Sequence, residues 1–212
     1  MKYNGRIYTV LIVVGFQLVD FLNRYFNHLG FNFVDVLSYT LTLTAGFLIG
    51  LKYDQAVFYS QRDELTTLYN RRFLSNFFNR LSPSGRTKYF VLIIDCDNFK
   101  MINDSHGHHM GDLVLQRAGT ILKSSTRKQD IVARWGGDEF VIIGLYEDKD
   151  AMRNFMQRLD EQFRSMSSTL GFPVSISLGY SLYPNHSEEL QELLRLADRN
   201  MYVSKEGKKK PF

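Results

Sequence analysis

The sequence predicts an α/β (α+β) domain, in which helices surround a central sheet, preceded by an N-terminal helical hairpin. Two observations support this prediction. Positions 1–51 contain only five of the chain's 26 basic and 22 acidic residues. From position 52 onward, short apolar runs of strand length alternate with longer segments whose apolar residues recur every three or four positions. Strands interleaved with helices are typical of a sheet covered by helices.

The composition limits the class of protein. The 212 residues provide for one domain of roughly 150 residues and a short additional segment. A net charge of +4 excludes a strongly basic nucleic-acid-binding protein and an acidic disordered tail, so we expect no nucleic acid polymer as a partner. The hydrophobic content of 44% excludes a disordered chain. The single cysteine, Cys96, excludes a disulfide framework or a multi-cysteine zinc site and indicates a reducing compartment.

The N-terminal segment contains two apolar stretches, which we predict to be transmembrane helices over about 7–26 and 31–51. Crossing a bilayer core of about 30 Å takes about 20 helical residues. Each stretch reaches that length only by including an aspartate, Asp20 in the first and Asp35 in the second. The aspartates favour the alternative, a soluble or peripheral helical hairpin. A cleaved signal peptide fits poorly, because no small-x-small site follows the first stretch.

Basic residues flank the two stretches. Lys2 and Arg6 precede the first and Lys52 follows the second, which favours a cytoplasmic location for both termini. We therefore predict a multi-pass protein of the cell (inner or plasma) membrane, with membrane lipid as a partner. The two aspartates would lie near the interface on the side of the connecting loop, where they are solvated or have a pairing or sensing role. Residues 52–62 are predicted to be a helical linker, and residues 63–212 the second domain.

Periodicity predicts the elements of this second domain. Asp63 is expected to open a helix, and apolar residues at helical spacing predict another helix over 71–81, followed by a loop at 82–85. Gly136-Gly137 between two apolar runs indicates a β-hairpin. The remaining predicted elements are strands at 89–94, 131–135, 140–143 and 174–182, and helices at 111–124, 151–166 and from 187 onward.

Acidic residues stand at two points of this pattern. Asp95-Cys96-Asp97 follows an apolar strand directly, and strand ends are where ligands tend to bind in such sheets. Asp138 and Glu139 follow the paired glycines of the hairpin, which allow the backbone to approach a ligand closely. Hard oxygen ligands of this kind suit Mg²⁺ holding a phosphate. From spacing alone, a metal site and ordinary solvated turns both remain open.

Four blocks of the sequence, in matching order, resemble those of the GGDEF domain family. They are Asp63–Arg72, similar to the opening DxLTGLxNRR; Asp95–Asp112, similar to the central block; Arg134–Phe140, which carries the signature; and Ala197–Lys205, similar to the closing helix. The resemblance covers about 150 residues, from 63 to 212. It implies a GGDEF or nucleotide-cyclase-like fold and diguanylate cyclase activity, in which two GTP condense into cyclic di-GMP and release two pyrophosphates. Thr67 replaces the family's usual Gly, and because Thr would resist a positive φ, we expect this turn to differ slightly.

The resemblance also assigns roles at the acidic points. Asp95, Asp138 and the main-chain carbonyl of Cys96 are the implied ligands of Mg²⁺ or Mn²⁺, two ions per active site. Asp138 or Glu139 would take the proton from a ribose 3′-hydroxyl, and the sequence leaves both open. Lys100 would supply positive charge to the transition state.

Further residues are implied to bind the substrate. Asn103 and Asp112 resemble guanine readers, because a carboxylate that accepts from guanine N1–H and N2–H₂ would reject adenine. Lys205 resembles a triphosphate-binding lysine. Lys208 or Lys209 would be a second basic contact, or these residues belong to a solvated tail or one attracted to anionic lipid. The other implied substrate-binding residues are Phe99, His108, Gly136 and Gly137.

One motif implies regulation. Arg127-x-x-Asp130 lies at the position of the family's inhibitory site, which binds the product cyclic di-GMP. An arginine fork can hold a phosphate or a guanine edge through two hydrogen bonds. Arg158, on the next predicted helix, is a candidate helper. We therefore expect product inhibition.

The resemblance also has consequences for assembly. Each GGDEF domain binds one GTP, so catalysis implies a homodimer, with the two-helix anchor and linker as its dimerising element. The alternative functions are a non-catalytic module at the membrane that binds GTP or cyclic di-GMP, and a membrane scaffold. The presence of Asp95, Asp138 and Glu139 favours the enzyme.

Overall fold

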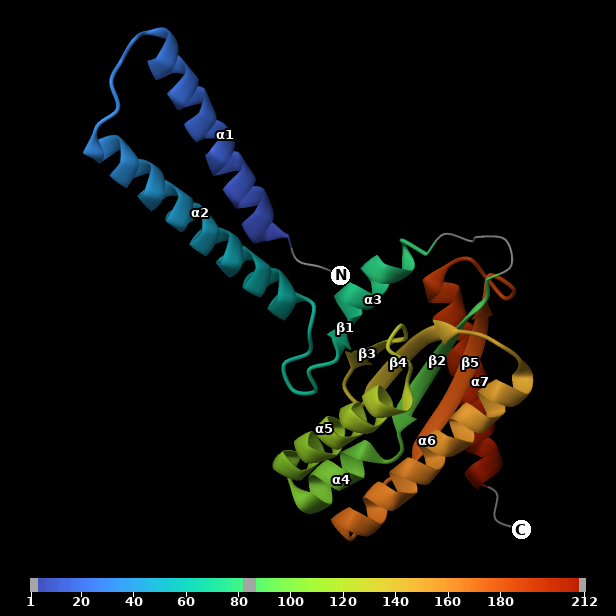
Figure 1. Ribbon diagram of the computed structural model, residues 1–212. Helices are drawn as coiled ribbons and strands as arrows, with labels where there is room; N and C mark the ends of the chain where they lie inside the picture. The colour runs from blue at the N-terminus through green and yellow to red at the C-terminus, as the bar shows by residue number, and fades with distance from the viewer. Residues whose placement is uncertain (1–3, 82–86, 210–212) are drawn as a thin grey trace. The chain divides into compact units, whose positions relative to one another are not determined.

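The computed structural model describes the backbone of residues 4–81 and 87–209, and the predicted loop at 82–85 lies outside these ranges. The chain divides into two compact units, Met1–Gln61 and Arg62–Phe212. The first unit consists of two antiparallel helices, α1 (Gly5–Phe26) and α2 (Phe33–Ser60) (Figure 1). The predicted N-terminal helical hairpin is therefore confirmed.

Glycines allow the two helices of the hairpin to approach closely. A Cβ atom on Gly50 would collide with the backbone of Arg6, and one on Gly46 would fall 2.8 Å from a methyl group of Val13. Polar contacts join the helices at both ends. At one end the Asp54 carboxylate accepts a hydrogen bond from the N–H of Gly5 at 2.7 Å. At the loop end Arg24 forms ion pairs with Asp20 at 3.0 Å and Asp35 at 2.9 Å.

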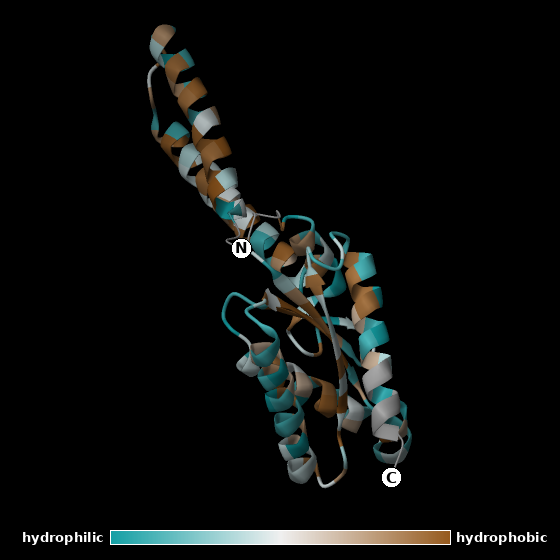
Figure 2. Ribbon diagram, turned by 90° about the vertical axis from the view of Figure 1, so that its right-hand side faces the viewer, coloured by the Kyte–Doolittle hydropathy of each residue, from teal (hydrophilic) through white to brown (hydrophobic). Residues whose placement is uncertain are grey.

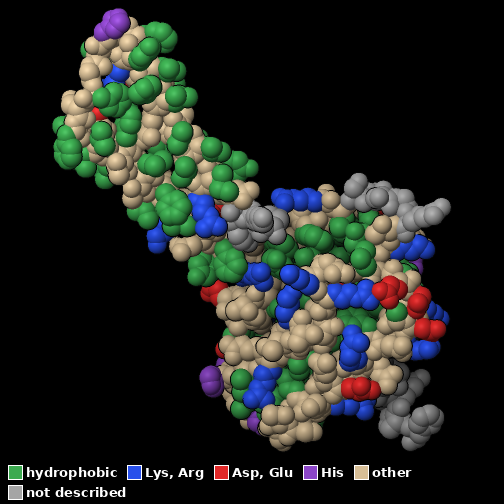
Figure 3. Space-filling view, in the orientation of Figure 1, with side chains coloured by type: hydrophobic (Ala, Val, Ile, Leu, Met, Phe, Trp, Pro, Cys, Tyr) green, Lys and Arg blue, Asp and Glu red, His purple; other side chains and the backbone are tan. Residues whose placement is uncertain are grey.

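The outer surface of the hairpin is apolar. Hydrophobic residues run along both helices in Figure 2, and green side chains are spread over the visible face of the hairpin in Figure 3. Both helices are long and apolar enough to cross a membrane. In the most apolar 18-residue segment of each, only 6% of the residues in α1 and 11% in α2 are buried inside the structure. Large side chains that are more than half exposed include Leu11, Phe16, Val19, Phe33, Leu41 and Ile49. Helices of a soluble core would instead bury such residues.

The second unit is built on a five-stranded mixed sheet with the order β1-β3-β4-β2-β5. Only the short β1–β3 pair is parallel; the other neighbours in this sheet are antiparallel. The strands are β1 (Tyr69–Asn70), β2 (Tyr89–Cys96), β3 (Ile131–Gly136), β4 (Glu139–Leu145) and β5 (Ile176–Tyr183). The apolar strand predicted at 89–94 is thus β2, which lies between β4 and β5 and is apolar on both faces.

Helices cover both faces of the sheet (Figure 1). They are α3 (Arg71–Phe78), α4 (Phe99–His106), α5 (His108–Ser125), α6 (Lys149–Leu170) and α7 (Leu190–Lys209). Because side chains alternate along a strand, Leu92 and Ile94 of β2 join the core formed with α4, α5 and α6, whereas Val91 and Ile93 join the core formed with α3 and α7. The predicted fold class, a central sheet surrounded by helices, is confirmed.

Two expectations about the entry to this unit are wrong. Asp63 opens a turn rather than a helix: its carboxylate accepts from the Thr66 N–H at 2.8 Å and the Thr66 hydroxyl at 2.7 Å, and the next helix begins at Arg71. Thr67 does not resist a positive φ but adopts one of 59°. Hydrogen bonds hold this conformation, because the Thr67 N–H donates to the carbonyl of Asp63 and its carbonyl accepts from Arg62.

Candidate active site

The predicted acids meet at one edge of the sheet. Asp95, near the end of β2, is paired with Glu139, the first residue of β4. The N–H of the next residue, Cys96, donates to the carbonyl of Asp138 at 3.3 Å. Gly137 has a φ of 47°, which allows the tight turn that precedes these acids. The structure therefore brings together, on two neighbouring strands, carboxylates that lie more than 40 positions apart in the sequence.

The edge carries an excess of negative charge. Burial raises the pKa of Asp138, and the charge of Asp95 raises it further. Burial and the charges of Asp95 and Asp138 likewise raise the pKa of Glu139. Partly buried carboxylates that repel one another are stabilised by a cation between them. Raised pKa values also make these groups better proton acceptors than ordinary carboxylates.

Lys205 on α7 supplies a positive charge to this edge. Its Nζ lies 2.6 Å from Oδ1 of Asp95 and 3.5 Å from Oδ1 of Asp97. Burial favours the neutral amine, but the contacts with Asp95 outweigh it and raise the pKa of Lys205. The side chains of Lys208 and Lys209 lie outside the described residues.

Asp97 has a positioning role that the sequence did not reveal. It accepts hydrogen bonds from the hydroxyl of Ser175, just before β5, at 2.8 Å and from that of Ser177, within β5, at 2.6 Å. These serines are two residues apart, so they lie on the same face of the strand. That spacing was the available signal, but it becomes informative only once the β2–β5 register is known. Through these bonds Asp97 links the loop after β2 to β5.

The implied guanine readers lie on the two helices that follow β2. Asn103 is on α4 and Asp112 is on α5, and the helices meet at Gly107, which has a φ of 82°. A side chain on Gly111 would collide with the Asn103 amide, so this glycine allows the amide to lie between the helices. The other implied residues of this segment, Lys100 and His108, are exposed, and Phe99 packs partly against the core; all three lie on α4 or at the start of α5.

Arg134 holds the turn that carries the acids, a role that the sequence also did not reveal. Its guanidinium donates to the carbonyl of Gly137 at 2.8 and 2.9 Å, and Nη1 lies 3.2 Å from both carboxylate oxygens of Asp63. Burial opposes ionisation of Asp63, but hydrogen bonds from Thr66 and the charge of Arg134 lower the pKa of this carboxyl overall. The opening turn of the unit is thereby connected to the acidic turn. The remaining implied residue of this turn, Gly136, is exposed.

The donor set at the edge fits a hard divalent cation. Asp95, Asp138 and the carbonyl of Cys96 offer oxygen ligands, as Mg²⁺ and Mn²⁺ prefer. The described residues contain no cluster of three or more His, Cys, Asp or Glu side chains placed to hold a metal ion. A site here would therefore be completed by oxygens of the substrate or of water. The Cys96 thiol does not contribute, because it is buried and burial raises its pKa.

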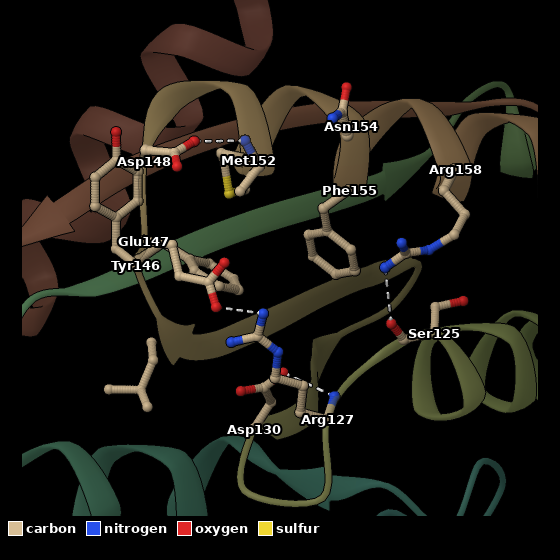
Figure 4. A pocket seen from close by; sticks show the side chains of 13 residues that line it. Ser125, Arg127, Asp130, Tyr146, Glu147, Asp148, Met152, Asn154, Phe155 and Arg158 are labelled. Atoms are coloured by element: carbon tan, nitrogen blue, oxygen red, sulfur yellow. Dashed lines mark hydrogen bonds and ion pairs between the residues drawn. The ribbon is translucent and has the colours of Figure 1, made fainter.

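The Arg127-x-x-Asp130 motif, implied by the resemblance to be inhibitory, lines a separate pocket of about 250 Å³ between the loop after α5 and the start of α6 (Figure 4). The Arg127 N–H donates to Oδ2 of Asp130 at 2.8 Å, and the Asp130 N–H donates to the Arg127 carbonyl at 3.0 Å. Oδ1 of Asp130 is buried, and among the described residues it has no hydrogen-bond partner. Arg158 lies on the opposite wall and donates to the Ser125 carbonyl at 3.3 Å. The structure thus brings all three predicted residues to one pocket.

The mixed sheet, its covering helices and the acidic turn at its edge define a domain of GGDEF type. The family model described as "Diguanylate cyclase, GGDEF domain" matches residues 60–211. The chain therefore belongs to the GGDEF family, as the four sequence blocks indicated.

Relatives and solved structures agree with this assignment. The chain is 33% identical to the uncharacterized protein YhcK of Bacillus subtilis, in an alignment that covers 92% of this chain and 58% of YhcK. It is 37% identical to the diguanylate cyclase TpbB of Pseudomonas aeruginosa over 69% of this chain and 35% of TpbB. The chain thus spans well under two thirds of the length of these curated relatives. The match to YhcK extends beyond the GGDEF domain into the N-terminal segment, since it covers more of the chain than residues 60–211.

Among solved structures, the coiled coil and GGDEF domain of DgcB from Caulobacter crescentus, in complex with c-di-GMP, aligns with a TM-score of 0.70 and 25% identity. That alignment covers 81% of this chain and 95% of the DgcB chain. The GGDEF domain of TpbB aligns with a TM-score of 0.60 and 32% identity, over 69% of this chain and 89% of that chain.

Proposed function

We propose that this protein is a membrane-anchored diguanylate cyclase that condenses two GTP into cyclic di-GMP and two pyrophosphates. The observation that carries the proposal is the meeting of Asp95, Asp138 and Glu139 at the sheet edge, with Lys205 beside them. Membership of the GGDEF family and the names of its relatives support the same reaction.

The residues at the edge suit the chemistry of nucleotidyl transfer. Asp138 or Glu139 accepts the proton of a ribose 3′-hydroxyl. The 3′-oxygen then forms a bond to the α-phosphorus of the other GTP, and the bond from that phosphorus to the pyrophosphate oxygen breaks. Lys205 and Lys100 are proposed to bind the phosphates and neutralise charge on the leaving group.

Asp95, Asp138 and the Cys96 carbonyl would hold the divalent cations, Mg²⁺ or Mn²⁺, two per site. When bound, such ions supply positive charge to the attacking and leaving oxygens. Asn103 and Asp112 are proposed to select the guanine nucleobase. A carboxylate acceptor that faces guanine N1–H and N2–H₂ would reject adenine, because adenine lacks this pair of donors.

The reaction requires a homodimer, because each domain is proposed to bind one GTP and the two nucleotides must face each other. The apolar hairpin is proposed to anchor the protein in the cell membrane, with both termini and the GGDEF domain in the cytoplasm. Its exposed apolar helices support insertion. Fractionation of the full chain against a chain beginning at Lys52 tests this anchor: the first should sediment with membranes and the second should not.

Product inhibition is proposed to act through Arg127, Asp130 and Arg158. The buried acceptor of Asp130 suits a guanine edge, which carries two neighbouring N–H donors. The guanidinium groups suit the phosphates of the cyclic dinucleotide.

Turnover of GTP tests the proposed activity. The full chain, purified in detergent, is incubated with GTP and Mg²⁺, and cyclic di-GMP and pyrophosphate are measured. We expect product from the wild type and a loss of roughly 10²- to 10⁴-fold in Asp138→Asn, the range for removal of a general base. Asp150→Asn, on the exposed side of α6, is the control and should keep full activity.

A non-catalytic module is the second candidate function. A wild type that is dimeric and binds GTP but makes no product would overturn the cyclase and support that module.

A further inference from the structure

The inhibitory pocket contains a counter-ion for its own arginine. Nη2 of Arg127 lies 2.5 Å from Oε1 of Glu147, and about half of each side chain is exposed. Figure 4 shows the Arg127 guanidinium turned toward Glu147, with the Phe155 ring between Glu147 and Arg158. Glu147 lies outside the Arg-x-x-Asp motif, so the motif gives no indication of it.

The backbone on both sides of Glu147 is fixed. The N–H of Tyr146 donates to the carbonyl of Lys88 at 2.9 Å. Oδ1 of Asp148 accepts from the N–H of Ala151 at 2.7 Å and so caps the N-terminus of α6. Glu147 is therefore held at the edge of the pocket, opposite the loop that carries Arg127.

The charges of the pocket are unfavourable for an anion. Among the described residues that line it, the carboxylates of Asp130, Glu147 and Asp148 outnumber the guanidinium groups of Arg127 and Arg158. Arg158 already donates to the Ser125 carbonyl and lies over the ring of Phe155, 5.4 Å from its centroid. A phosphate that enters the pocket must therefore displace Glu147 from its ion pair with Arg127 or bind beside the negative charge of Glu147.

We propose that Glu147 competes with the phosphate of the inhibitory cyclic dinucleotide for Arg127, and so raises the product concentration at which the enzyme is inhibited. This inference rests on the proposed product inhibition. Because exposed ion pairs are weak in water, a ligand can displace Glu147, and the carboxylate adjusts affinity rather than blocking the site. Glu147 is thus a specificity and affinity determinant of the pocket rather than a part of the reaction.

Direct binding of cyclic di-GMP tests the proposal. The full chain in detergent, without GTP, is titrated calorimetrically as wild type, Glu147→Gln and Glu147→Lys. We expect Glu147→Gln to bind up to roughly fivefold more tightly, the upper end of the range for loss of an exposed charge pair. Glu147→Lys should bind more tightly still, because it adds a cation. Asp150→Asn removes a carboxylate in the first turn of α6 that pairs with Arg153 outside the pocket, and its affinity should equal that of the wild type.

The opposite role for Glu147 would give the opposite result. If the carboxylate orients Arg127 for the ligand, Glu147→Gln will bind equally or more weakly at an unchanged Tm, and the proposal is overturned.

An Arg127→Ala variant separates this failure from that of the inhibitory site itself. If Arg127→Ala binds cyclic di-GMP as the wild type does, the ligand binds elsewhere and both ideas fail. Turnover of GTP, measured without added product, reports on the cyclase proposal independently.

Discussion

The acidic sheet edge and the pocket that contains Arg127 belong to the same unit, and both are proposed to bind nucleotide phosphate, but through different charged groups. At the edge, Asp95, Asp138 and Glu139 leave an excess of negative charge, which divalent metal ions would neutralise. In the pocket, the protein itself supplies the cations, Arg127 and Arg158, and Glu147 already neutralises one of them. Carboxylates therefore outnumber protein cations in both regions, and the two regions differ in the cation proposed to meet the phosphate, a metal ion at the edge and an arginine in the pocket.

The largest effect is expected from removal of the pocket arginine, Arg127, which should weaken inhibition by cyclic di-GMP. Arg127→Ala deletes the guanidinium proposed to hold phosphate and leaves Glu147 without its partner at the pocket edge. Truncating one member of a buried, hydrogen-bonded charge pair costs about 2–5 kcal/mol, and we take the lower end because half of the Arg127 side chain is exposed. We expect the affinity for cyclic di-GMP to fall by roughly 30-fold or more.

The measurement is the product concentration that halves the initial rate of GTP turnover. Arg153→Ala, an exposed arginine on α6 with an ion pair to Asp150, is the control. Equal inhibition of the Arg127 variant and the control would show that the two regions do not differ in the proposed way.

A smaller effect, on turnover of GTP, is expected from removal of Arg134, which holds the acidic turn of the edge in position. Arg134→Ala removes the bonds to the Gly137 carbonyl and to Asp63, so the acidic turn gains freedom. Misplacement of catalytic groups lowers turnover, and we expect kcat to fall by about tenfold with a smaller change in KM. The kinetic split is informative, because a loss of GTP binding alone would raise KM and leave kcat intact. Such a result would assign Arg134 to substrate binding instead of positioning.

The sequence predicted the elements of the second unit where hydrophobic periodicity was strong. The apolar runs of β2 and β4, the alternation of β5 and the helical segments α5 and α6 were each recognisable. The short helix α4 was missed, because its eight residues are mostly polar and bury one residue, Ile102. Strand β1 was missed because it has two residues.

The candidate site was predictable for similar reasons, and only in part. Asp95 and Asp138 could be identified because a strand end and a glycine turn precede them in the sequence. Asp97 with Ser175, and Arg134 with Asp63, join positions 78 and 71 residues apart. Such contacts depend on strand register and on the path of the opening turn, which one sequence does not specify. Glu147 was missed for the same reason.

The buried carboxylate of the pocket, like the acids of the edge, should also affect folding in a pH-dependent way. Burial raises the pKa of Asp130 above its ordinary value of 3.8. The folded state therefore binds this proton more tightly than the unfolded chain does. The resulting stability is complete below the unfolded pKa and is lost as the pH rises through the folded pKa.

Asp130→Asn removes the buried charge but keeps an acceptor for the Arg127 N–H. We expect the variant to be about 1 kcal/mol more stable than the wild type at pH 7, the scale for an unsatisfied buried group. The difference should vanish below about pH 4. Thermal unfolding of the full chain at the two pH values checks this expectation. A variant that is less stable at pH 7 would mean that the carboxylate makes favourable contacts in the pocket.

The smallest effect is expected at Thr67, in the opening turn that Arg134 connects to the edge. A β-branched residue with a φ of 59° is strained, and the left-handed conformation costs roughly 1–2 kcal/mol. Thr67→Gly removes this strain, but glycine loses more backbone entropy on folding, which offsets about 0.5–1 kcal/mol. The net result should be a gain in stability of up to about 1 kcal/mol, measured by denaturant unfolding, with Thr67→Ala as the comparison that keeps a Cβ atom. Because the turn bonds of Asp63 involve Thr66 and not the Thr67 side chain, kcat should change little. A loss of stability in Thr67→Gly would mean that contacts of the threonine side chain outweigh the strain of its backbone.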